Sequence, residues 1–258
     1  MRPVIQNLGA SKIREVANAG IGRDDVLAFW FGESDEVTPM PTREAAIASL
    51  RDGDTFYAHN LGMLELREAI SRYTSALHGP VGVERIAVTS SGVSALMIAV
   101  QALVGAGDEV VAVVPVWPNL TAQPEILGAQ VRRVSLKPLQ GRWQLDLDEL
   151  KRAITSSTRL LVLNAPNNPT GWTLTRTEQQ AILDHCRSTG TGILADEVYE
   201  RLYFEGAEGD SAAAPSFLDV SEPEDRLIVV HSFSKSFLMT GWRLGWMVVP
   251  PSALEALG

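Results

Sequence analysis

The chain has 258 residues, of which 45% are hydrophobic, and its formal net charge at pH 7 is −9. This length allows one large core or two modest domains, and an acidic chain without a block of lysine and arginine is not typical of nucleic-acid-binding proteins. The single cysteine, Cys186, excludes an internal disulfide framework. No apolar run approaches the roughly 20 residues that a membrane span needs, and the first residues lack the apolar region of a signal peptide. We therefore expect a cytoplasmic protein that binds neither nucleic acid nor a membrane, and we expect no metal site.

The N-terminal part of the chain is expected to contain three helices and one strand. Polar and apolar residues are spaced as in amphipathic helices over residues 11–19, which a serine cap opens, over 41–51 and over 63–77. Residues 28–35, with the sequence Ala-Phe-Trp-Phe-Gly-Glu-Ser-Asp, are typical of a strand that runs into a turn. Residues 56–62 are predicted to form a loop before the third helix.

Strands and helices alternate through the rest of the chain. Short apolar runs rich in β-branched residues predict buried strands, and the segments between them have helical periodicity. This alternation predicts a mostly parallel sheet that helices cover on both faces, which is a three-layer αβα domain. The expected strands are 85–89, 108–114, 130–136, 159–163, 191–199, 227–230 and 244–249, and the expected helices are 94–104, 177–188 and one that opens within 143–150.

Several expected strands end in small, polar or aromatic residues, at the edge where ligands bind in parallel sheets. The turn at residues 91–93 joins a strand to a helix start, and such turns bind anions through their free amides, although many turns of this kind look similar. Trp117, after a strand, is on its own more typical of a core or interface residue than of a ligand contact. Turn chemistry alone explains most of the loop 164–171. Asp196 directly follows an apolar strand, so its carboxylate requires a buried cation or donor.

Lys235 is the most unusual charged residue of the chain. Most lysines are solvated surface charges, but Lys235 is one of only four, and no other charged residue lies between Arg226 and Arg243. Small hydroxyls, aromatic residues and one nearby cation suit a cofactor that carries a carbonyl and a phosphate. Desolvation or the cation would lower the pKa of the amine, which would then form a Schiff base. The hydroxyls of Ser232 and Ser234, together with Arg243, would hold the phosphate.

The stretch 232–246, Ser-Phe-Ser-Lys-Ser-Phe-Leu-Met-Thr-Gly-Trp-Arg-Leu-Gly-Trp, closely resembles the lysine segment of class I/II pyridoxal-phosphate-dependent aminotransferases, the fold-type I enzymes of the aspartate aminotransferase superfamily. Motifs similar to Gly-Glu-x-Asp, Pro-x-Trp-Pro-Asn, Asn-Pro-Thr-Gly and Ala-Asp-Glu-Val-Tyr also occur in order, so the resemblance covers residues from about 31 to 250. It implies that residues 41–258 form the large domain, which binds pyridoxal 5'-phosphate. Residues 1–40 would belong to the small domain and the substrate entrance, and most of the small domain would be missing from this chain. Residues 205–216 are expected to form a mobile loop.

The resemblance implies catalytic roles for the matching residues. Lys235 would hold the cofactor as a Schiff base and would move the proton between the substrate α-carbon and the cofactor. Asp196 would keep the pyridine nitrogen protonated, while Tyr199 and Asn168 would hydrogen-bond the phenolic oxygen. Trp117 would stack on the ring.

The resemblance also implies the phosphate and substrate contacts. Tyr57 would reach the phosphate of the other subunit in a homodimer, although by itself it reads as a half-buried packing residue. Gly32 would approach the substrate carboxylate, unless it is a plain turn glycine. The phosphate contacts within the chain would be Ser91, Gly92, Val93, Ser232, Ser234 and Arg243.

The implied reaction is transamination between an L-amino acid and a 2-oxo acid, as part of amino acid metabolism. β-Lyases of the same fold share these motifs, and so do catalytically silent sensor domains, although no helix-turn-helix segment precedes the fold here. Val93 stands where some bacterial aspartate-type relatives carry a lysine for the distal carboxylate, which disfavours aspartate and glutamate as substrates. Family members continue beyond the equivalent of residue 258 and supply there an arginine that forks onto the α-carboxylate. We therefore expect this chain to be a fragment that binds pyridoxal 5'-phosphate but transaminates poorly by itself, and that associates through an uncovered apolar face.

Overall fold

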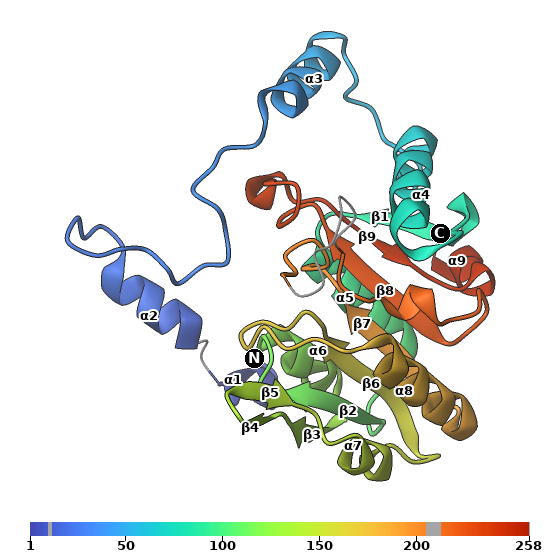
Figure 1. Ribbon diagram of the computed structural model, residues 1–258. Coiled ribbons are helices and arrows are strands. Elements are labelled where there is room, and N and C mark those ends of the chain that lie inside the picture. The colour runs from blue at the N-terminus through green and yellow to red at the C-terminus, as the bar shows by residue number, and fades with distance from the viewer. Residues whose placement is uncertain (10–11, 205–212, 258) are drawn as a thin grey trace.

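The computed structural model describes residues 1–9, 12–204 and 213–257, and a seven-stranded sheet lies at its centre (Figure 1). The strand order is β1-β9-β8-β7-β6-β2-β3. Strands from β3 to β8 pair in parallel, whereas β9 runs antiparallel to both of its neighbours. The expected mostly parallel sheet is therefore confirmed. Its strands are β1 (Ile86–Thr89), β2 (Glu109–Val114), β3 (Gln130–Ser135), β6 (Thr158–Asn164), β7 (Gly192–Asp196), β8 (Leu227–Ser232) and β9 (Gly245–Val248).

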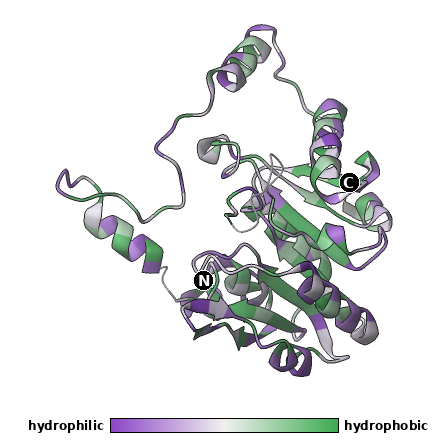
Figure 2. Ribbon diagram, viewed as in Figure 1, coloured by the Kyte–Doolittle hydropathy of each residue, from purple (hydrophilic) through white to green (hydrophobic). Residues whose placement is uncertain are grey.

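Alternate residues of the central strands enter two separate cores. On β6, Leu161 and Leu163 belong to one core cluster, and Leu160 and Val162 belong to the other. Every residue of β7, β8 and β9 is buried, as expected for strands that helices cover on both faces. Figure 2 shows the sheet as an apolar layer with polar residues on the outer sides of the helices.

Two groups of helices cover the sheet and complete the three layers. On one face, α4 (Leu64–His78), α7 (Leu147–Ala153) and α8 (Arg176–Thr189) contribute to the first core. On the other, α5 (Gly92–Leu103), α6 (Asn119–Leu127) and α9 (Pro251–Leu257) contribute to the second. Among the described residues, no helix has the length and apolar character needed to cross a membrane. Short 3₁₀ turns lie at η1 (Val83–Arg85), η2 (Phe217–Asp219) and η3 (Thr240–Trp242).

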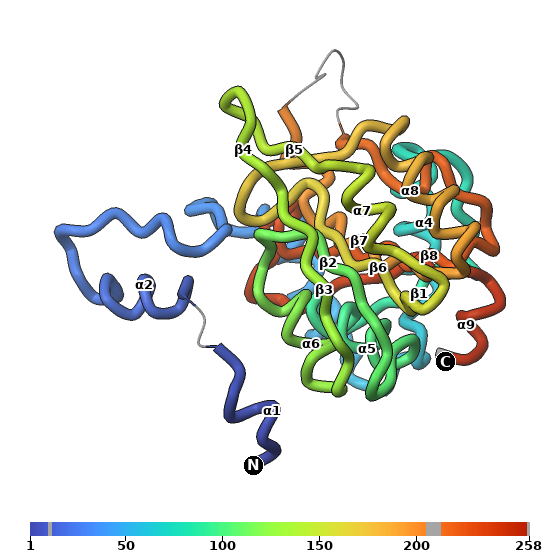
Figure 3. Tube along the Cα trace, turned by 90° about the horizontal axis from the view of Figure 1, so that it is seen from below, coloured from blue at the N-terminus to red at the C-terminus, as the bar shows by residue number. Residues whose placement is uncertain are grey.

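The N-terminal segment lies apart from the sheet. Figure 1 shows α2 (Lys12–Gly20) and α3 (Met40–Arg51) reaching away from the body of the molecule, and Figure 3 shows the same for α2. Between these helices, Gly32 and Thr38 contact the segment that follows β8. The short helix α1 (Pro3–Gln6) precedes them and contacts α6. The predicted helices 41–51 and 63–77 match α3 and α4 to within one residue. The predicted helix 11–19 matches α2, and the predicted serine cap lies outside the described residues.

The predicted strand at residues 28–35 is wrong. These residues form bends and a tight turn, in which the amide of Glu33 donates to Phe31 O at 2.9 Å. Their apolar side chains find other partners: Trp30 packs so closely on Gly20 of α2 that a Cβ there would meet its ring at 2.5 Å. An apolar run becomes a strand only where a neighbouring strand can pair with it, and this segment has none among the described residues.

Two further boundaries differ from the prediction. Trp143 lies in a small hairpin of β4 (Lys137–Leu139) and β5 (Arg142–Gln144), and the helix begins only at Leu147 because Asp146 caps it by accepting from the amide of Glu149 at 2.9 Å. The strand predicted over 191–199 ends at Asp196, where the chain turns. Of the predicted loop 205–216, residues 205–212 lie outside the described residues, and Ala214 and Ser216 are buried.

Candidate active site

A cleft with a volume of about 1600 Å³ opens at the carboxyl edge of the sheet. The segments that follow β1, β2, β6, β7 and β8 all contribute to its lining, because parallel strands present their carboxyl ends at one edge. Most predicted site residues meet there. Those that line the cleft are Gly32, Gly92, Val93, Trp117, Asn168, Asp196, Tyr199, Ser232, Ser234, Lys235 and Arg243.

Lys235 projects into the cleft from the turn after β8. Its Nζ donates to Gly32 O at 2.5 Å and lies 5.8 Å from the centre of the Tyr199 ring. Burial lowers the pKa of the Lys235 amine, the Arg243 cation lowers it further, and Glu33 opposes both. A larger fraction of neutral amine makes Lys235 a better nucleophile than a surface lysine.

Gly32 is fixed by contacts between its segment and the loop after Lys235. Thr38 donates its hydroxyl to Leu238 O at 2.5 Å and accepts from the indole of Trp242 at 2.9 Å. A Cβ at Gly32 would lie 3.6 Å from Lys235 Nζ and 3.7 Å from the Tyr199 hydroxyl. The structure thus brings residue 32 to the centre of the cleft, although the predicted strand around it is absent.

Asp196 is the last residue of β7, and its side chain is buried at the floor of the cleft. Burial raises the pKa of its carboxyl group to about 7, while the amide of Val198, at 3.4 Å, and the Lys235 cation act in the opposite direction. Asp196 forms no salt bridge within the part of the chain that the structure describes. A buried carboxylate that faces a cleft without an ion-pair partner is suited to a ligand that carries a proton or a positive charge.

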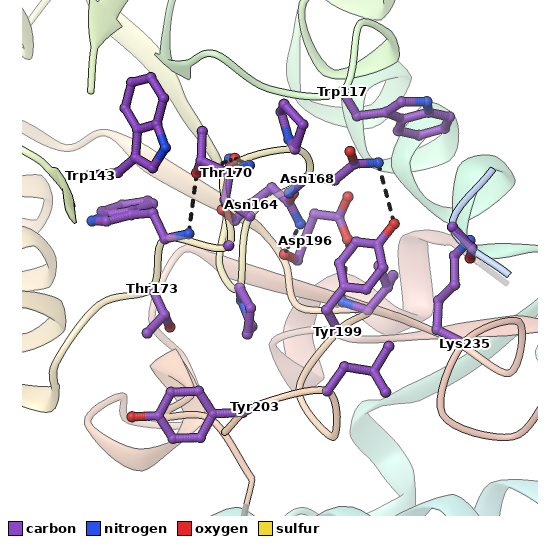
Figure 4. A pocket seen from close by; sticks show the side chains of 18 of the residues that line it. Trp117, Trp143, Asn164, Asn168, Thr170, Thr173, Asp196, Tyr199, Tyr203 and Lys235 are labelled. Carbon is purple, nitrogen blue, oxygen red and sulfur yellow. Dashed lines mark hydrogen bonds between the residues drawn. The ribbon is translucent and has the colours of Figure 1, made fainter. Parts of the chain in front are cut away.

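Asn168 and Tyr199 form a pair of hydrogen-bonding groups beside Asp196 (Figure 4). Asn168 Nδ2 donates to the Tyr199 hydroxyl at 3.3 Å. Asn164, which the sequence analysis did not select, holds this arrangement: its side chain donates to Asp196 O at 2.9 Å and accepts from the Asn168 amide at 2.6 Å. Its only signal in the sequence is an asparagine at the end of a buried apolar run.

The turn at residues 91–93 has the geometry of an anion site. Ser91 caps α5 by accepting from the amide of Ser94 at 3.1 Å, and the free amides of the first turn lie at the cleft. Two glycines let this turn pack directly against β8 and β9. A Cβ at Gly92 would lie 3.1 Å from that of Ser232, and a Cβ at Gly245 would lie 2.4 Å from Gly92 N.

Arg243 and the hydroxyls of the Lys235 segment line the cleft near this turn. Arg243 adopts a left-handed backbone conformation with φ of 57°, and its Nη1 donates to Thr240 O at 2.7 Å. That bond uses one of five guanidinium donors, so the others remain for a ligand. Ser232 accepts from the Ser234 amide at 3.1 Å, and both side chains face the cleft.

Two predicted site residues lie elsewhere. Ser91 is buried behind the turn and acts on the cleft through the helix start that it caps. Tyr57 is fully exposed, between α3 and α4, and does not line the cleft. The cleft also includes aromatic residues that the sequence did not single out, among them Trp143 and Tyr203 (Figure 4). No group of three or more potential metal ligands occurs among the described residues.

The fold and the cleft define a class of protein: a three-layer α/β protein with a half-buried lysine, a buried carboxylate and an anion site at one sheet edge. The chain belongs to the family described as aminotransferase class I and II, whose model matches residues 29–258. Members of this family depend on pyridoxal 5'-phosphate, and the donor set in the cleft fits that group: an anion turn for the phosphate, an unpaired buried carboxylate for the ring nitrogen, and an amine for the carbonyl carbon.

Known proteins similar to this chain are amino-group transferases. An aspartate aminotransferase from Pyrococcus horikoshii is 33% identical over 96% of this chain and 61% of its own length, and the arginine–pyruvate transaminase AruH from Pseudomonas aeruginosa is 35% identical over 90% and 58%. The solved structure of aspartate aminotransferase from Thermus thermophilus with maleate superposes with a TM-score of 0.87 at 32% identity, covering 100% of this chain and 66% of that one. The chain thus spans less than two thirds of the curated relatives that it matches.

Proposed function

We propose that this chain binds pyridoxal 5'-phosphate through Lys235 and forms the large-domain part of an enzyme that transfers an amino group between an amino acid and a 2-oxo acid. The observation that carries the proposal is the convergence of Lys235, Asp196 and the 91–93 turn on one cleft, from strand ends far apart in sequence. When bound, the cofactor supplies an electron sink that weakens the bond to the substrate's α-proton.

Each residue of the cleft contributes a separate physical effect. The neutral amine of Lys235 would bond to the carbonyl carbon with loss of water, and the amine of the substrate would displace it. The freed Lys235 amine would then take the proton from the substrate α-carbon as a general base and deliver it to the cofactor as an acid. Asp196 would hold a proton on the ring nitrogen of the cofactor. The protonated nitrogen would in turn stabilise the carboxylate form of Asp196, which burial alone disfavours. Tyr199 and Asn168 donate to the phenolic oxygen. Trp117 packs on the ring.

The phosphate is held by groups that are already in place in the chain. The amides of the 91–93 turn, with the helix start of α5 behind them, bind anions without further rearrangement. Ser232, Ser234 and Arg243 complete the site from the other side. Burial of the phosphate between a helix start and a guanidinium supports tight binding.

The substrates are inferred from the relatives and from Val93. The names of the relatives include aspartate, aromatic-amino-acid and arginine–pyruvate transferases, which supports an amino acid and a 2-oxo acid as the substrate pair. Val93 gives the cleft an apolar wall at the start of α5. An apolar residue at position 93 offers no positive charge to a carboxylate on the substrate side chain. We therefore expect a substrate without such a carboxylate next to Val93.

We also propose a cytoplasmic homodimer in which residues 1–40 contribute to the substrate entrance and the small domain, and 41–258 form the large domain. Phe29, Phe56 and Tyr57 are each at least 88% exposed in the single chain, which supports their burial against a second copy. Tyr57 would then reach the phosphate of the partner's site. The free thiol of Cys186 is compatible with a reducing compartment.

A panel of amino acids with 2-oxoglutarate or pyruvate tests this function. For the enzyme of which this chain forms the large domain, the expected result is a new amino acid that forms together with the 2-oxo acid of the donor. Pyruvate and ammonia released without an acceptor would identify a β-lyase instead, and a change in the visible spectrum without turnover would identify a sensor. Lys235→Ala is the control that removes all three responses.

A further inference from the structure

A second group of ionisable side chains is buried beside the turn that follows β7 and carries Tyr199. None of its members lines the cleft, and none has a role in the function proposed above. Its side chains come from α4, the turn after β7, η2 and β8. We call it the buried histidine–carboxylate cluster, and its members are Tyr73, His78, Glu197, Glu200, Asp219 and His231.

His78, the last residue of α4, joins two carboxylates. Its Nδ1 lies 3.0 Å from Asp219 Oδ1 and its Nε2 lies 3.2 Å from Glu200 Oε2, and the three side chains are at most 6% exposed. Two carboxylate acceptors require two N–H donors, which only the imidazolium form offers. Burial disfavours that form, but the hydrogen bonds to Asp219 and Glu200 outweigh it and raise the pKa of His78 to about 9.

Glu200 is the centre of the cluster. Its Oε1 accepts from the Tyr73 hydroxyl at 2.8 Å, and its Oε2, which faces His78, also lies 3.6 Å from His231 Nδ1. Burial lowers the pKa of His231, so this histidine does not share the charge of His78. His78 is therefore the cation that balances the charge of Glu200. The carboxylate of Glu200 is held by three side chains, those of Tyr73, His78 and His231.

The same stretch of chain carries both the cluster and the cleft residues. Asp196 and Tyr199 line the cleft, whereas Glu197 and Glu200 turn into the body of the protein. Beyond Asp196 the chain is a turn rather than a strand. Glu197 N donates to Val230 O and Glu200 N to Glu197 O, each at 3.0 Å, while Tyr199 O and Glu200 O each accept from a later backbone amide at 2.8 Å. The side chains of Glu197 and Glu200 add to these bonds and tie the turn to the interior.

Glu197 anchors the start of the turn and Glu200 its end. Glu197 accepts from the hydroxyl of Ser216 and, at 2.9 Å, from the amide of Phe217. Glu200 is one residue from Tyr199, so a displacement of Glu200 moves the Tyr199 hydroxyl directly.

We propose that His78 and Glu200 are positioning residues: the His78 imidazolium fixes Glu200, and Glu200 fixes residues 196–200 so that the Tyr199 hydroxyl faces Asn168 and the cleft. The ordering of the turn is independent of the proposed function, and only its effect on a bound cofactor rests on that function. The sequence does not reveal this link, since His78 and Glu200 are 122 residues apart.

The stabilisation that the His78–Glu200 pair gives has a defined pH dependence. The titratable groups that face His78 are Glu197 and Glu200 beyond β7, His231 on β8 and Asp219 on η2. The second oxygen of Asp219 accepts from Arg176 at 3.1 Å. The pKa of His78 is raised in the folded protein, so protonated His78 stabilises the fold. This stabilisation is complete below about pH 6.5 and is lost as the pH rises through about 9. Burial also raises the pKa of Glu197 to about 8, so Glu197 titrates in the same pH range. A change of stability with pH is therefore assigned to the His78–Glu200 pair only if it disappears in His78→Gln.

Amide hydrogen exchange tests the ordering of the turn without a cofactor. In His78→Gln, a peptide that contains residues 196–204 should exchange about tenfold faster, because a charge-assisted hydrogen bond is lost, while a peptide from β6 stays unchanged. His185→Gln is the matched control, since the ring of His185 on α8 lies away from the cluster and has a single hydrogen-bond partner among the described residues, Ile154 O at 3.1 Å. Exchange that is unchanged, or equally faster throughout the sheet, would overturn the proposal.

Two further variants separate positioning from a general loss of stability. Tyr73→Phe removes only the hydroxyl that donates to Glu200 and should raise exchange in the same peptide. The double variant His78→Gln/Glu200→Gln removes the unbalanced buried charge, so its exchange should lie closer to that of the wild type than His78→Gln does. A double variant that is worse than His78→Gln would contradict the pairing of these two residues.

The visible spectrum of bound pyridoxal 5'-phosphate tests the link to Tyr199. A hydroxyl donated to the phenolic oxygen stabilises the more negative, deprotonated chromophore, so misplacing Tyr199 in His78→Gln should move the pH midpoint of the band upward by about one unit, and His185→Gln should leave it unchanged. Faster exchange with an unmoved midpoint would overturn the link to Tyr199. If the wild type shows no band, the proposed function fails, and the exchange result still decides the positioning.

Discussion

Replacing Gly245 with alanine is expected to damage the anion turn, although residue 245 does not line the cleft. Gly245 begins β9 directly behind the turn. An added Cβ would lie 2.4 Å from Gly92 N and 2.6 Å from Ser91 C, and both are backbone atoms. Unbonded heavy atoms prefer separations of about 3.5 Å or more, so the turn and β9 must separate by about 1 Å.

The size of this effect follows from the cost of overpacking, which is about 1–3 kcal/mol for an added methyl group in a packed interior. If the turn takes up the whole displacement, the affinity for pyridoxal 5'-phosphate falls by about 5-fold to about 150-fold, since 1.4 kcal/mol corresponds to a factor of ten. If β9 takes it up, the same cost is seen in the unfolding free energy of the protein without cofactor.

The assay is a titration with pyridoxal 5'-phosphate followed by visible absorbance, together with urea unfolding of the cofactor-free protein. Gly241→Ala is the matched control, because residue 241 has no neighbour within 4 Å of an added Cβ and lies only four positions away. Gly245→Ala should differ from the wild type in at least one measurement and Gly241→Ala in neither. If Gly245→Ala matches the control in both, the close approach at the turn does not matter as we describe.

Three other outcomes are expected. Asp196→Ala should keep the fold and lose about 100-fold or more in turnover, because the ring nitrogen would lose the carboxylate that keeps it protonated; a loss below tenfold would make Asp196 a merely structural carboxylate. Without cofactor, Asp196→Asn should be more stable than the wild type above pH 7 and equally stable below about pH 4: burial raises the pKa of Asp196 from 3.8 to about 7, so the folded state binds more protons and stability falls as the pH rises between these values. A difference that does not vary with pH would exclude this cause. Sedimentation should give a dimer whose cofactor affinity drops in Tyr57→Phe, and a monomer with full cofactor occupancy would reject the role of Tyr57 across the interface.

Local sequence patterns predicted the sheet because its strands carry their own signal. The run at residues 227–230 is apolar and β-branched, and it lies in β8 as a strand buried on both faces. Asp196 was found because it directly follows such a run, at the edge where a parallel sheet binds ligands. Lys235 was found because no other charged residue lies near it in the sequence, and the role of Asn168 followed from the resemblance to a family. The position of these residues in the cleft is thus a consequence of strand order.

Features that depend on distant partners could not be predicted in the same way. The segment 28–35 has the composition of a strand, but a strand also needs a neighbour, and Trp30 packs on α2 instead. His78 looks like an ordinary last-turn histidine of a helix, and only the fold brings it to Asp219, 141 residues away. Asn164 has no feature that separates it from other strand-end residues until its bonds to Asp196 and Asn168 are seen.

The covalent attachment of the cofactor is the central claim, and borohydride reduction tests it most directly. After incubation with pyridoxal 5'-phosphate and reduction, peptide mass spectrometry should find one phosphopyridoxyl group, on Lys235. Lys137→Ala, which removes an exposed lysine paired with Glu149, should leave the labelling unchanged, and Lys235→Ala should abolish both the label and the visible band. A label that persists in Lys235→Ala, or that is spread over several lysines in the wild type, would contradict the assignment of Lys235 as the residue that holds the cofactor.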